Sequence, residues 1–298
     1  MDKKIENACR IEDLLNEYKS KEQVFKRLKY LGFDLESVES FQSIVIEDGL
    51  INSGCFVHDL KTCQLFEKVC INKASFEREF NLFKEVPSDA LVAPKYFGCY
   101  KDKIIFSVYY EAVDIRLIPS KMHLRSNMLQ LAIKLWMNEI YLSPMVKNKA
   151  ISCEFERLMK KDNIIKSLSG IFVNKGISGD VLKEMAKLAD RSNNVIFHGD
   201  YHSGNVLYDG KRYYVVDWDK WSVSKVGVGF LMKYRDFKKI NFFRQFMYTC
   251  SLDINKRIIN NFILYNVMVW MDKEKIAEVN AYVHFIKEHW IDKLSMTN

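Results

Sequence analysis

The sequence lacks the features that mark membrane-spanning and secreted proteins. No run of about eighteen apolar residues occurs in it, which is the length that a membrane-spanning helix needs. The N-terminal segment MDKKIENACRIEDLL is too charged for a secretory signal. The cysteines number seven and form no Cys-x-x-Cys pair, which favours reduced thiols over disulfides or a zinc site. We therefore expect a cytoplasmic protein with no membrane partner.

A dinucleotide fingerprint and a strong charge bias are also absent. Gly227-x-Gly229 lacks a third glycine and a preceding strand at the right place. The formal net charge of +7 is spread along the chain rather than gathered in a tail. Such a charge is compatible with an anionic ligand and does not require nucleic acid, so we expect no nucleic-acid partner. With 298 residues, 48% of them hydrophobic, the chain can form one large domain or two lobes.

The most informative stretch of the chain covers residues 195–219. Two short apolar runs, 195–197 and 213–216, are typical of buried strands. Each run leads into polar side chains: His198, Asp200, His202 and Asn205 after the first, and Asp217 and Asp219 after the second. Asn205 and Asp217 offer the oxygen ligands that a hard cation on polyphosphate prefers. Asp200 is then available to orient an attacking hydroxyl group.

Two motifs in this stretch resemble a known signature. The motif His198-Gly199-Asp200-x-His202-x-x-Asn205, followed by Asp217-Trp218-Asp219, resembles that of the aminoglycoside phosphotransferase and choline kinase family. The family has a protein-kinase-like fold and transfers the γ-phosphate of ATP to a hydroxyl group of a small molecule. The resemblance covers about residues 41–230 and is dense only between residues 198 and 219.

The resemblance implies a role for each of these residues. Asp200 is the catalytic carboxylate, and Asn205 and Asp217 hold Mg²⁺ on the β- and γ-phosphates of ATP. His198 and His202 order the loop. Asp219 lies next to the metal-binding residues and is not itself expected to bind the metal. ATP and Mg²⁺ are thus the expected cofactors, and a small-molecule hydroxyl compound is the expected partner.

The segment before this stretch predicts a small sheet, and the resemblance implies that the sheet carries a phosphate-binding lysine. Strands are expected at residues 41–47, 55–60 and 64–71, with turns between them. The turn that would cover the phosphates holds Gly49, Ser53 and Gly54, which is a weak phosphate-loop signal, and Ser53 is its candidate side chain. Lys68, on the third strand, has the place of the family's phosphate-binding lysine.

The helix after the third strand supplies a partner for Lys68. Its buried stripe is formed at helical spacing by Phe76, Phe80, Phe83 and Val86. Glu79 falls inside this stripe and Glu77 on its far edge. A charged group on an apolar face needs a partner, so we predict that Glu79, not Glu77, pairs with Lys68. Phe66 departs from the family, which places a small residue beneath adenine.

The strand at 104–110 ends in a segment that resembles the family's hinge, where backbone groups read the adenine edge. Tyr110 and Glu111 are the candidate hinge residues. An ordinary core strand explains the same residues equally well.

These signals predict a two-lobed α+β, protein-kinase-like fold. We expect a helical N-terminal extension over residues 1–40, a nucleotide-binding lobe with an antiparallel sheet over 41–110, and a mainly helical catalytic and substrate lobe over 111–298. The extension is expected to pack on the smaller lobe; the alternative is a separate partner-binding helix.

The function has two competing interpretations besides the small-molecule kinase. A catalytically weak, kinase-like nucleotide-binding or interaction module would explain the poor glycine turn and Phe66. A protein kinase ranks last, because the histidine-containing loop resembles the small-molecule branch. The intact set of Asp200, Asn205 and Asp217 favours catalysis, since a module without activity has no need for all three.

The C-terminal segment favours a particular class of acceptor. Residues 226–298 carry eleven basic and seven acidic side chains, an excess of four positive charges. Such a field repels a polycation and attracts an anion. We therefore expect a neutral or anionic hydroxyl compound, such as a sugar or sugar phosphate, rather than an aminoglycoside or choline. A solvated basic face far from the site is the alternative explanation.

Overall fold

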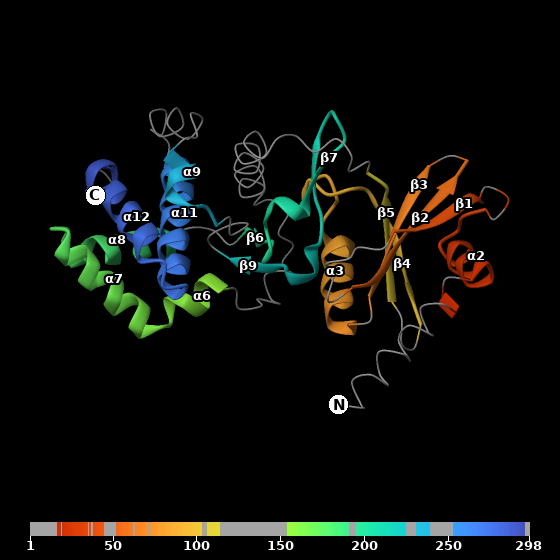
Figure 1. Cartoon of the computed structure of the whole chain (residues 1–298), viewed down its shortest axis with the longest axis horizontal. Coiled ribbons are helices and arrows are strands. Elements are labelled where there is room, and N and C mark those ends of the chain that lie inside the picture. Colours follow the sequence, from red (N-terminus) through yellow and green to blue (C-terminus); the bar gives the residue numbers. More distant parts are fainter. Residues whose placement is uncertain are drawn as a thin grey trace.

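The computed structural model describes residues 17–18, 20–34, 36, 38–44, 52–61, 63–70, 72–102, 106–113, 154–190, 195–224, 231–238 and 253–295. They form an α+β fold with two lobes, a sheet-based N-terminal lobe and a mainly helical C-terminal lobe (Figure 1). This is the fold class that the sequence predicts. The boundary near residue 110 stays a prediction.

The N-terminal lobe is built on a five-stranded antiparallel sheet with the strand order β1-β2-β3-β5-β4. The strands are β1 (Val38–Ile44), β2 (Asn52–Leu60), β3 (Gln64–Cys70), β4 (Tyr96–Lys101) and β5 (Phe106–Glu111). Helix α3 (Lys73–Glu85) covers one face of this sheet and α2 (Lys21–Tyr30) covers the other (Figure 1). The helix of the N-terminal extension therefore packs on the smaller lobe, as predicted.

The prediction of a phosphate-covering turn with Gly49, Ser53 and Gly54 is partly wrong. Asn52, Ser53 and Gly54 do not form a turn but the first residues of β2, and the register with β3 shifts between Asn52 and Gly54. A glycine at this point lets the strand absorb the irregularity without losing its pairing. Gly49 lies outside the described residues. The role of Ser53 in nucleotide binding stays a prediction.

Helix α3 has the phase that its apolar spacing predicts. Its N-cap is Asn72, whose Oδ1 accepts hydrogen bonds from the backbone N–H groups of Ala74 and Ser75 at 2.9 and 3.3 Å. The buried face is formed by Phe76, Glu79, Leu82 and Phe83. This cap and this stripe together point the carboxylate of Glu79 at the sheet.

The C-terminal lobe combines a helical body with short strands. Its helices are α6 (Glu154–Met159), α7 (Asp162–Asn174), α8 (Gly179–Asp190), α9 (Tyr234–Lys238), α11 (Asp253–Asp272), α12 (Ile276–His289) and α13 (Ile291–Ser295). Helix α11 packs against α8 and α12. Trp290 is fully buried in their core, whereas Trp270 is half-buried and donates to the carbonyl oxygen of Met232. The pattern of Leu131, Ile133, Leu135 and Trp136 predicts a further helix, and these residues lie outside the described ones.

The short strands of this lobe present the two motifs. They are β6 (Val195–Phe197), β7 (Val206–Tyr208), β8 (Tyr213–Val215) and β9 (Ser222–Ser224), with 3₁₀ turns η4 (Ser203–Asn205) and η5 (Trp218–Lys220). β6 pairs with β9, and β7 pairs with β8, both antiparallel. The first motif connects β6 to β7, and the second connects β8 to β9.

The two lobes meet at the second motif. η5 packs against α3, and the indole N–H of Trp221 donates to the carbonyl oxygen of Arg78 at 2.6 Å. The backbone N–H of Val215 donates to the carbonyl oxygen of Val92 at 2.8 Å. These contacts place the end of β8 beside the helix that carries Glu79. Within the described ranges, no helix is both long and apolar enough to cross a membrane.

Candidate active site

The loop after β6 is braced by a buried histidine. His198 has no exposed surface, its Nε2 lies 2.9 Å from the carbonyl oxygen of Val216, and its Nδ1 accepts from the backbone N–H of Asp200 at 3.2 Å. Burial lowers the pKa of His198 to about 4, so the ring is neutral near pH 7. The hydrogen bonds then assign the proton to Nε2. His198 thus joins the two motifs and orients the next carboxylate without titrating near neutral pH.

Gly199 is required by a close backbone contact. Its φ of +83° lies in the left-handed region, and a Cβ atom there would come 2.2 Å from the carbonyl oxygen of Lys220. Since that neighbour is backbone, it cannot move aside as a side chain would. The glycine of the motif therefore lets the loop after β6 lie directly on η5.

Asp200 is the accessible carboxylate of the loop. Its side chain is 33% exposed, and its Oδ2 accepts a hydrogen bond from the ammonium group of Lys220 at 2.6 Å. That hydrogen bond is the main cause of the raised pKa of Lys220. His202 lies on the other side, with Nε2 at 3.8 Å from Oδ1, and its Nδ1 accepts from the backbone N–H of Gly204. Lys220 was not predicted; its only sequence signal is its place directly after the second motif.

Asn205 is fixed to the same loop by both its side chain and its backbone. Its amide nitrogen donates to the carbonyl oxygen of Asp200 at 2.9 Å, and its own carbonyl oxygen accepts from the backbone N–H of Val216 at 3.0 Å. Because the amide nitrogen is engaged with the loop, the side-chain oxygen is the atom that can serve as a metal ligand.

Asp217 lies at a strained point of the backbone. It has φ 65° and ψ 57°, a left-handed conformation that few residues other than glycine adopt, although aspartate and asparagine tolerate it better than most. Its Oδ1 accepts a hydrogen bond from the Lys68 ammonium at 2.5 Å. The strained turn therefore brings a C-terminal-lobe carboxylate onto a lysine of the N-terminal sheet.

The predicted pair of Lys68 and Glu79 is confirmed. Lys68 Nζ donates to Glu79 Oε2 at 2.8 Å, and both side chains are almost fully buried. Glu77 instead lies on the exposed side of α3 and forms an ion pair with Lys73 at 3.7 Å. Burial lowers the pKa of Lys68, but the carboxylates of Glu79 and Asp217 raise it well above its ordinary value. The ammonium group is therefore charged and has carboxylates from both lobes around it.

Tyr110 contributes to this group through its side chain. Its hydroxyl donates to Glu79 Oε1 at 2.6 Å, which occupies the second oxygen of the carboxylate that holds Lys68. The next backbone N–H groups are also engaged, that of Glu111 with Lys95 and that of Ala112 with Gln64. The sequence did not reveal the Tyr110–Glu79 bond, and the hinge roles of Tyr110 and Glu111 stay predictions.

Asp219 is a buried carboxylate beside the same lysine. Only 4% of its surface is exposed, and its Oδ1 has no hydrogen-bond partner in the described part of the chain. Burial raises the pKa of Asp219, and the nearby Lys68 ammonium opposes this effect. An unsatisfied oxygen at this depth favours a further cationic ligand in the site.

A comparison with protein families identifies the segment that contains both motifs. Residues 174–230 match the model of the phosphotransferase enzyme family. The match indicates a small-molecule kinase. The resemblance that the motifs predict is therefore confirmed for this segment, which includes Asp200, Asn205 and Asp217. No curated protein sequence gives a significant match.

Solved structures of similar proteins include two phosphotransferases and a kinase. Spectinomycin phosphotransferase APH(9)-Ia, in complex with ADP and spectinomycin, is 12% identical, with 93% of this chain and 97% of that chain covered and a TM-score of 0.46. A mutant of aminoglycoside phosphotransferase APH(4)-Ia, in complex with AMP-PNP and hygromycin B, is 12% identical. The match covers 91% of this chain and 99% of that chain, with a TM-score of 0.44. Amicoumacin kinase is 10% identical, with 93% of this chain and 96% of that chain covered and a TM-score of 0.41.

The side chains of this kinase fit a magnesium ion. Asn205, Asp217 and Asp219 all offer side-chain oxygens, and Asp219 Oδ1 is buried without a hydrogen-bond partner in the described part of the chain. The described residues contain no group of three or more His, Cys, Asp or Glu side chains that could hold a metal by themselves. A small set of oxygen donors completed by substrate phosphates is typical of Mg²⁺ rather than of zinc or calcium.

Glu77 and Glu79, both on α3, provide a direct test of the site. We expect Glu79→Ala to reduce activity strongly, because it leaves the buried Lys68 ammonium without one of its two carboxylates and Tyr110 without its acceptor. Glu77→Ala, which removes only an exposed ion pair, should leave activity within about twofold, in line with the small worth of such pairs. The measurement is turnover of Mg-ATP by both variants at equal folded concentration. Greater damage from Glu77→Ala would show that the helix phase is misassigned.

Proposed function

We propose that this protein transfers the γ-phosphoryl group of Mg-ATP to a hydroxyl group of a small neutral or anionic compound. The observation that carries the proposal is the position of Lys68, which bonds to Glu79 of the N-terminal lobe at 2.8 Å and to Asp217 of the C-terminal lobe at 2.5 Å. These three residues come from distant parts of the chain, and an isolated turn rich in aspartate would not bring them together.

In the proposed reaction Asp200 is the catalytic residue. Its half-buried carboxylate accepts the proton of the acceptor hydroxyl, whose oxygen then forms a bond to the γ-phosphorus. The bond between that phosphorus and the β,γ-bridging oxygen breaks, and ADP leaves with the electron pair. Asp200 is well suited to this task, because His198 and Asn205 fix its backbone from both sides.

The remaining groups hold the nucleotide. Lys68, kept charged and in place by Glu79, would contact the phosphate oxygens when Asp217 turns to the metal. Asn205 and Asp217 would hold Mg²⁺, with Asp219 behind them. When bound, the ion offsets the negative charge of the β- and γ-phosphates. Ser53 and the backbone of Tyr110 and Glu111 are the further proposed nucleotide contacts.

The class of acceptor is proposed from the charge of the C-terminal lobe. Lys233, just before α9, and Arg235 and Lys238 on it are all exposed, whereas Asp236 is half-buried. This surface supports a positive field, which attracts anionic acceptors and repels polycationic ones. The effect should weaken as salt is added, because the Debye length falls.

A transfer assay tests the proposed function. The purified protein is incubated with Mg-ATP labelled at the γ-phosphate and with sugars, sugar phosphates, aminoglycosides or choline, at low and high salt. We expect label on a sugar or sugar phosphate, with slower transfer at high salt. Efficient labelling of aminoglycosides or choline, with the sugars inert, would contradict the proposed acceptor class. Binding of Mg-ATP without transfer to any compound, and without hydrolysis, would favour the interaction-module alternative.

A further inference from the structure

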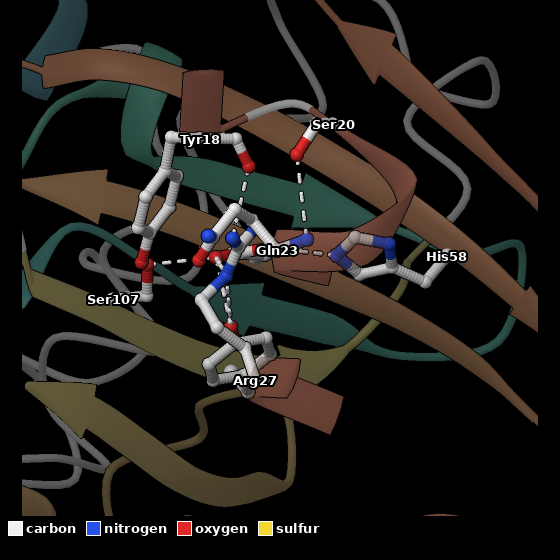
Figure 2. A network of polar contacts seen from close by, with 8 residues as sticks. Tyr18, Ser20, Gln23, Arg27, His58 and Ser107 are labelled. Carbon is white, nitrogen blue, oxygen red and sulfur yellow. Dashed lines mark hydrogen bonds and ion pairs between the residues drawn. The ribbon is translucent and has the colours of Figure 1, made fainter. Parts of the chain in front are cut away.

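A buried polar network lies on the face of the sheet opposite the site. At its centre is Glu67 of β3, which has no exposed surface and receives hydrogen bonds from side chains of β2, β5 and α2. Arg27 Nε donates to Oε1 at 2.9 Å and Arg27 Nη2 to Oε2 at 3.2 Å. Figure 2 shows Tyr18, Arg27, His58 and Ser107 of this network side by side. The network therefore joins the N-terminal extension to the middle of the nucleotide lobe.

The carboxylate of Glu67 is fully satisfied by its neighbours. His58 Nε2 lies 2.7 Å from Oε2, and the hydroxyls of Ser107 and Tyr109 donate to Oε1 at 2.7 and 2.8 Å. Burial raises the pKa of Glu67, but the bonds from His58 and Arg27 lower it to about 2. A carboxylate with this many fixed donors is ionised and has a single well-defined position.

Arg27 is held as firmly as its partner. Its guanidinium is fully buried, lies 3.6 Å from the ring centre of Tyr18, and donates through Nη1 to the carbonyl oxygen of Tyr18 at 2.9 Å. Tyr18 in turn shares a hydrogen bond of 2.7 Å with Ser107. On the same helix, Val24 and Leu28 pack against Leu65 and Tyr109 of the sheet. Helix α2 thus presents a fixed cation to the centre of β3.

The strands that this network joins are those that position Lys68. Glu67 and Lys68 are neighbours on β3, so their side chains point to opposite faces of the sheet. In register, Lys68 lies opposite Cys55 of β2 and Val108 of β5. On the reverse face, the same two strands supply His58, and Ser107 with Tyr109, to the carboxylate. A single carboxylate therefore links the three strands directly behind the lysine.

We propose that the Arg27–Glu67 ion pair is a positioning device for Lys68, which makes α2 a working part of the nucleotide-phosphate site. The inference rests on the proposed function, because it assigns Lys68 to the phosphates of ATP. Arg27 and Glu67 act through β3 and are positioning residues rather than catalytic ones.

A role in packing alone explains the network less well. Apolar residues of similar volume would fix a helix to a sheet without the cost of removing two charges from water, and replacing a buried ion pair by such residues is often neutral or stabilising. The charged network adds a defined geometry, because a guanidinium group that donates two parallel hydrogen bonds holds a carboxylate in one orientation. That property is useful where the strand must hold a lysine at a fixed distance from phosphate.

The test compares a charged ligand with an uncharged one. Dissociation constants of Mg-ATP and of adenosine, which has no phosphates, are measured for wild type, Arg27→Met, Arg27→Lys and Lys68→Met, at a temperature where circular dichroism shows each to be folded. Val24→Ala is the matched control, because it removes a fully buried side chain from the same helix without touching Glu67. For Arg27→Met we expect about tenfold weaker Mg-ATP binding, within the range for displaced binding groups, and unchanged adenosine binding. Val24→Ala should change neither.

Each other outcome overturns the inference or its basis. Equal losses for both ligands, or a loss in Val24→Ala that matches Arg27→Met, would show a general loosening of the lobe instead of displacement of Lys68. Should Arg27→Met fail to fold, Arg27→Lys, which keeps the charge but not the bidentate fork, must show the selective loss. Unchanged Mg-ATP affinity in a folded Arg27 variant would overturn the inference alone. A wild type that binds neither ligand, or a Lys68→Met variant with full Mg-ATP affinity, would overturn the proposed function first.

Discussion

Replacing Asp200 with asparagine should slow turnover of Mg-ATP about 10²-fold or more, the scale of a general base, while leaving Mg-ATP binding nearly intact. Asparagine keeps the size of the side chain but cannot accept the proton of the acceptor hydroxyl. The backbone contacts of the loop, from His198 Nδ1 and from the amide of Asn205, do not involve the carboxylate and should remain. The variant should therefore separate catalysis from binding.

The matched control for this variant is Asp180→Asn. Asp180 is an exposed carboxylate at the start of α8, and its ion pair with Lys183 is a surface contact. We expect wild-type turnover and binding from it. Equal turnover in Asp200→Asn and wild type would show that Asp200 is not the catalytic carboxylate.

Replacing Glu67 with glutamine should destabilise the protein by about 3–5 kcal/mol, the cost of leaving one member of a buried ion pair without its partner. The change keeps the shape of the side chain, removes its charge and turns one accepting oxygen into a donating NH₂ group, so the loss reports the unpaired Arg27 guanidinium together with the donors that lose their acceptor. Chemical denaturation measures it. The double variant Glu67→Gln with Arg27→Met removes both charges and should recover a large part of the loss. A single variant as stable as wild type would contradict the assignment of a charged pair.

The same pair predicts a pH dependence. The pKa of Glu67 is lowered from 4.5 to about 2 in the folded protein, so its ionised form is stabilised by folding. Its contribution is complete above about pH 4.5 and is lost as pH falls towards 2, on the order of 3 kcal/mol in total. Between about pH 4.5 and pH 2, the free energy of unfolding of Glu67→Gln should therefore fall less than that of wild type, by this amount. An equal fall in the two proteins would show that the carboxylate is not stabilised in its charged form.

The elements with a clear local signal are the ones that the sequence predicts well. The stripe of Phe76 and Phe83 sets the phase of α3, and the phase alone places Glu79 towards the sheet and Glu77 away from it. The cap of α8 is equally local, since the backbone N–H of Asp180 donates to Ser178 Oγ at 3.2 Å. Periodicity and capping act within a few residues, so the sequence contains all the information that they need.

The parts that could not be predicted depend on contacts between distant segments. Lys68 reaches Asp217 across 149 residues, and Arg27 reaches Glu67 across 40. The sequence predicts a helical N-terminal extension, but nothing in it marks Arg27 as fully buried. It gives no sign either that Glu67, the neighbour of Lys68, is buried. A charge that is buried because its partner lies on another element leaves no trace in local periodicity.

The start of β2 shows a different limit. Asn52, Ser53 and Gly54 are typical turn residues, yet they lie at the beginning of a strand because the pairing with β3 continues past them with a shifted register. Turn propensity was outweighed by the hydrogen bonds of the sheet, as tertiary context often outweighs local preference.

Calorimetric titration of Mg-ATP into wild type and Asp217→Ala tests the central claim most directly. Asp217 is the one carboxylate proposed both to hold the metal and to contact Lys68. The proposed site predicts saturable one-to-one binding to wild type that requires Mg²⁺, and much weaker binding to Asp217→Ala. Equal Mg-ATP affinity for the two proteins, or no binding to wild type, would contradict it.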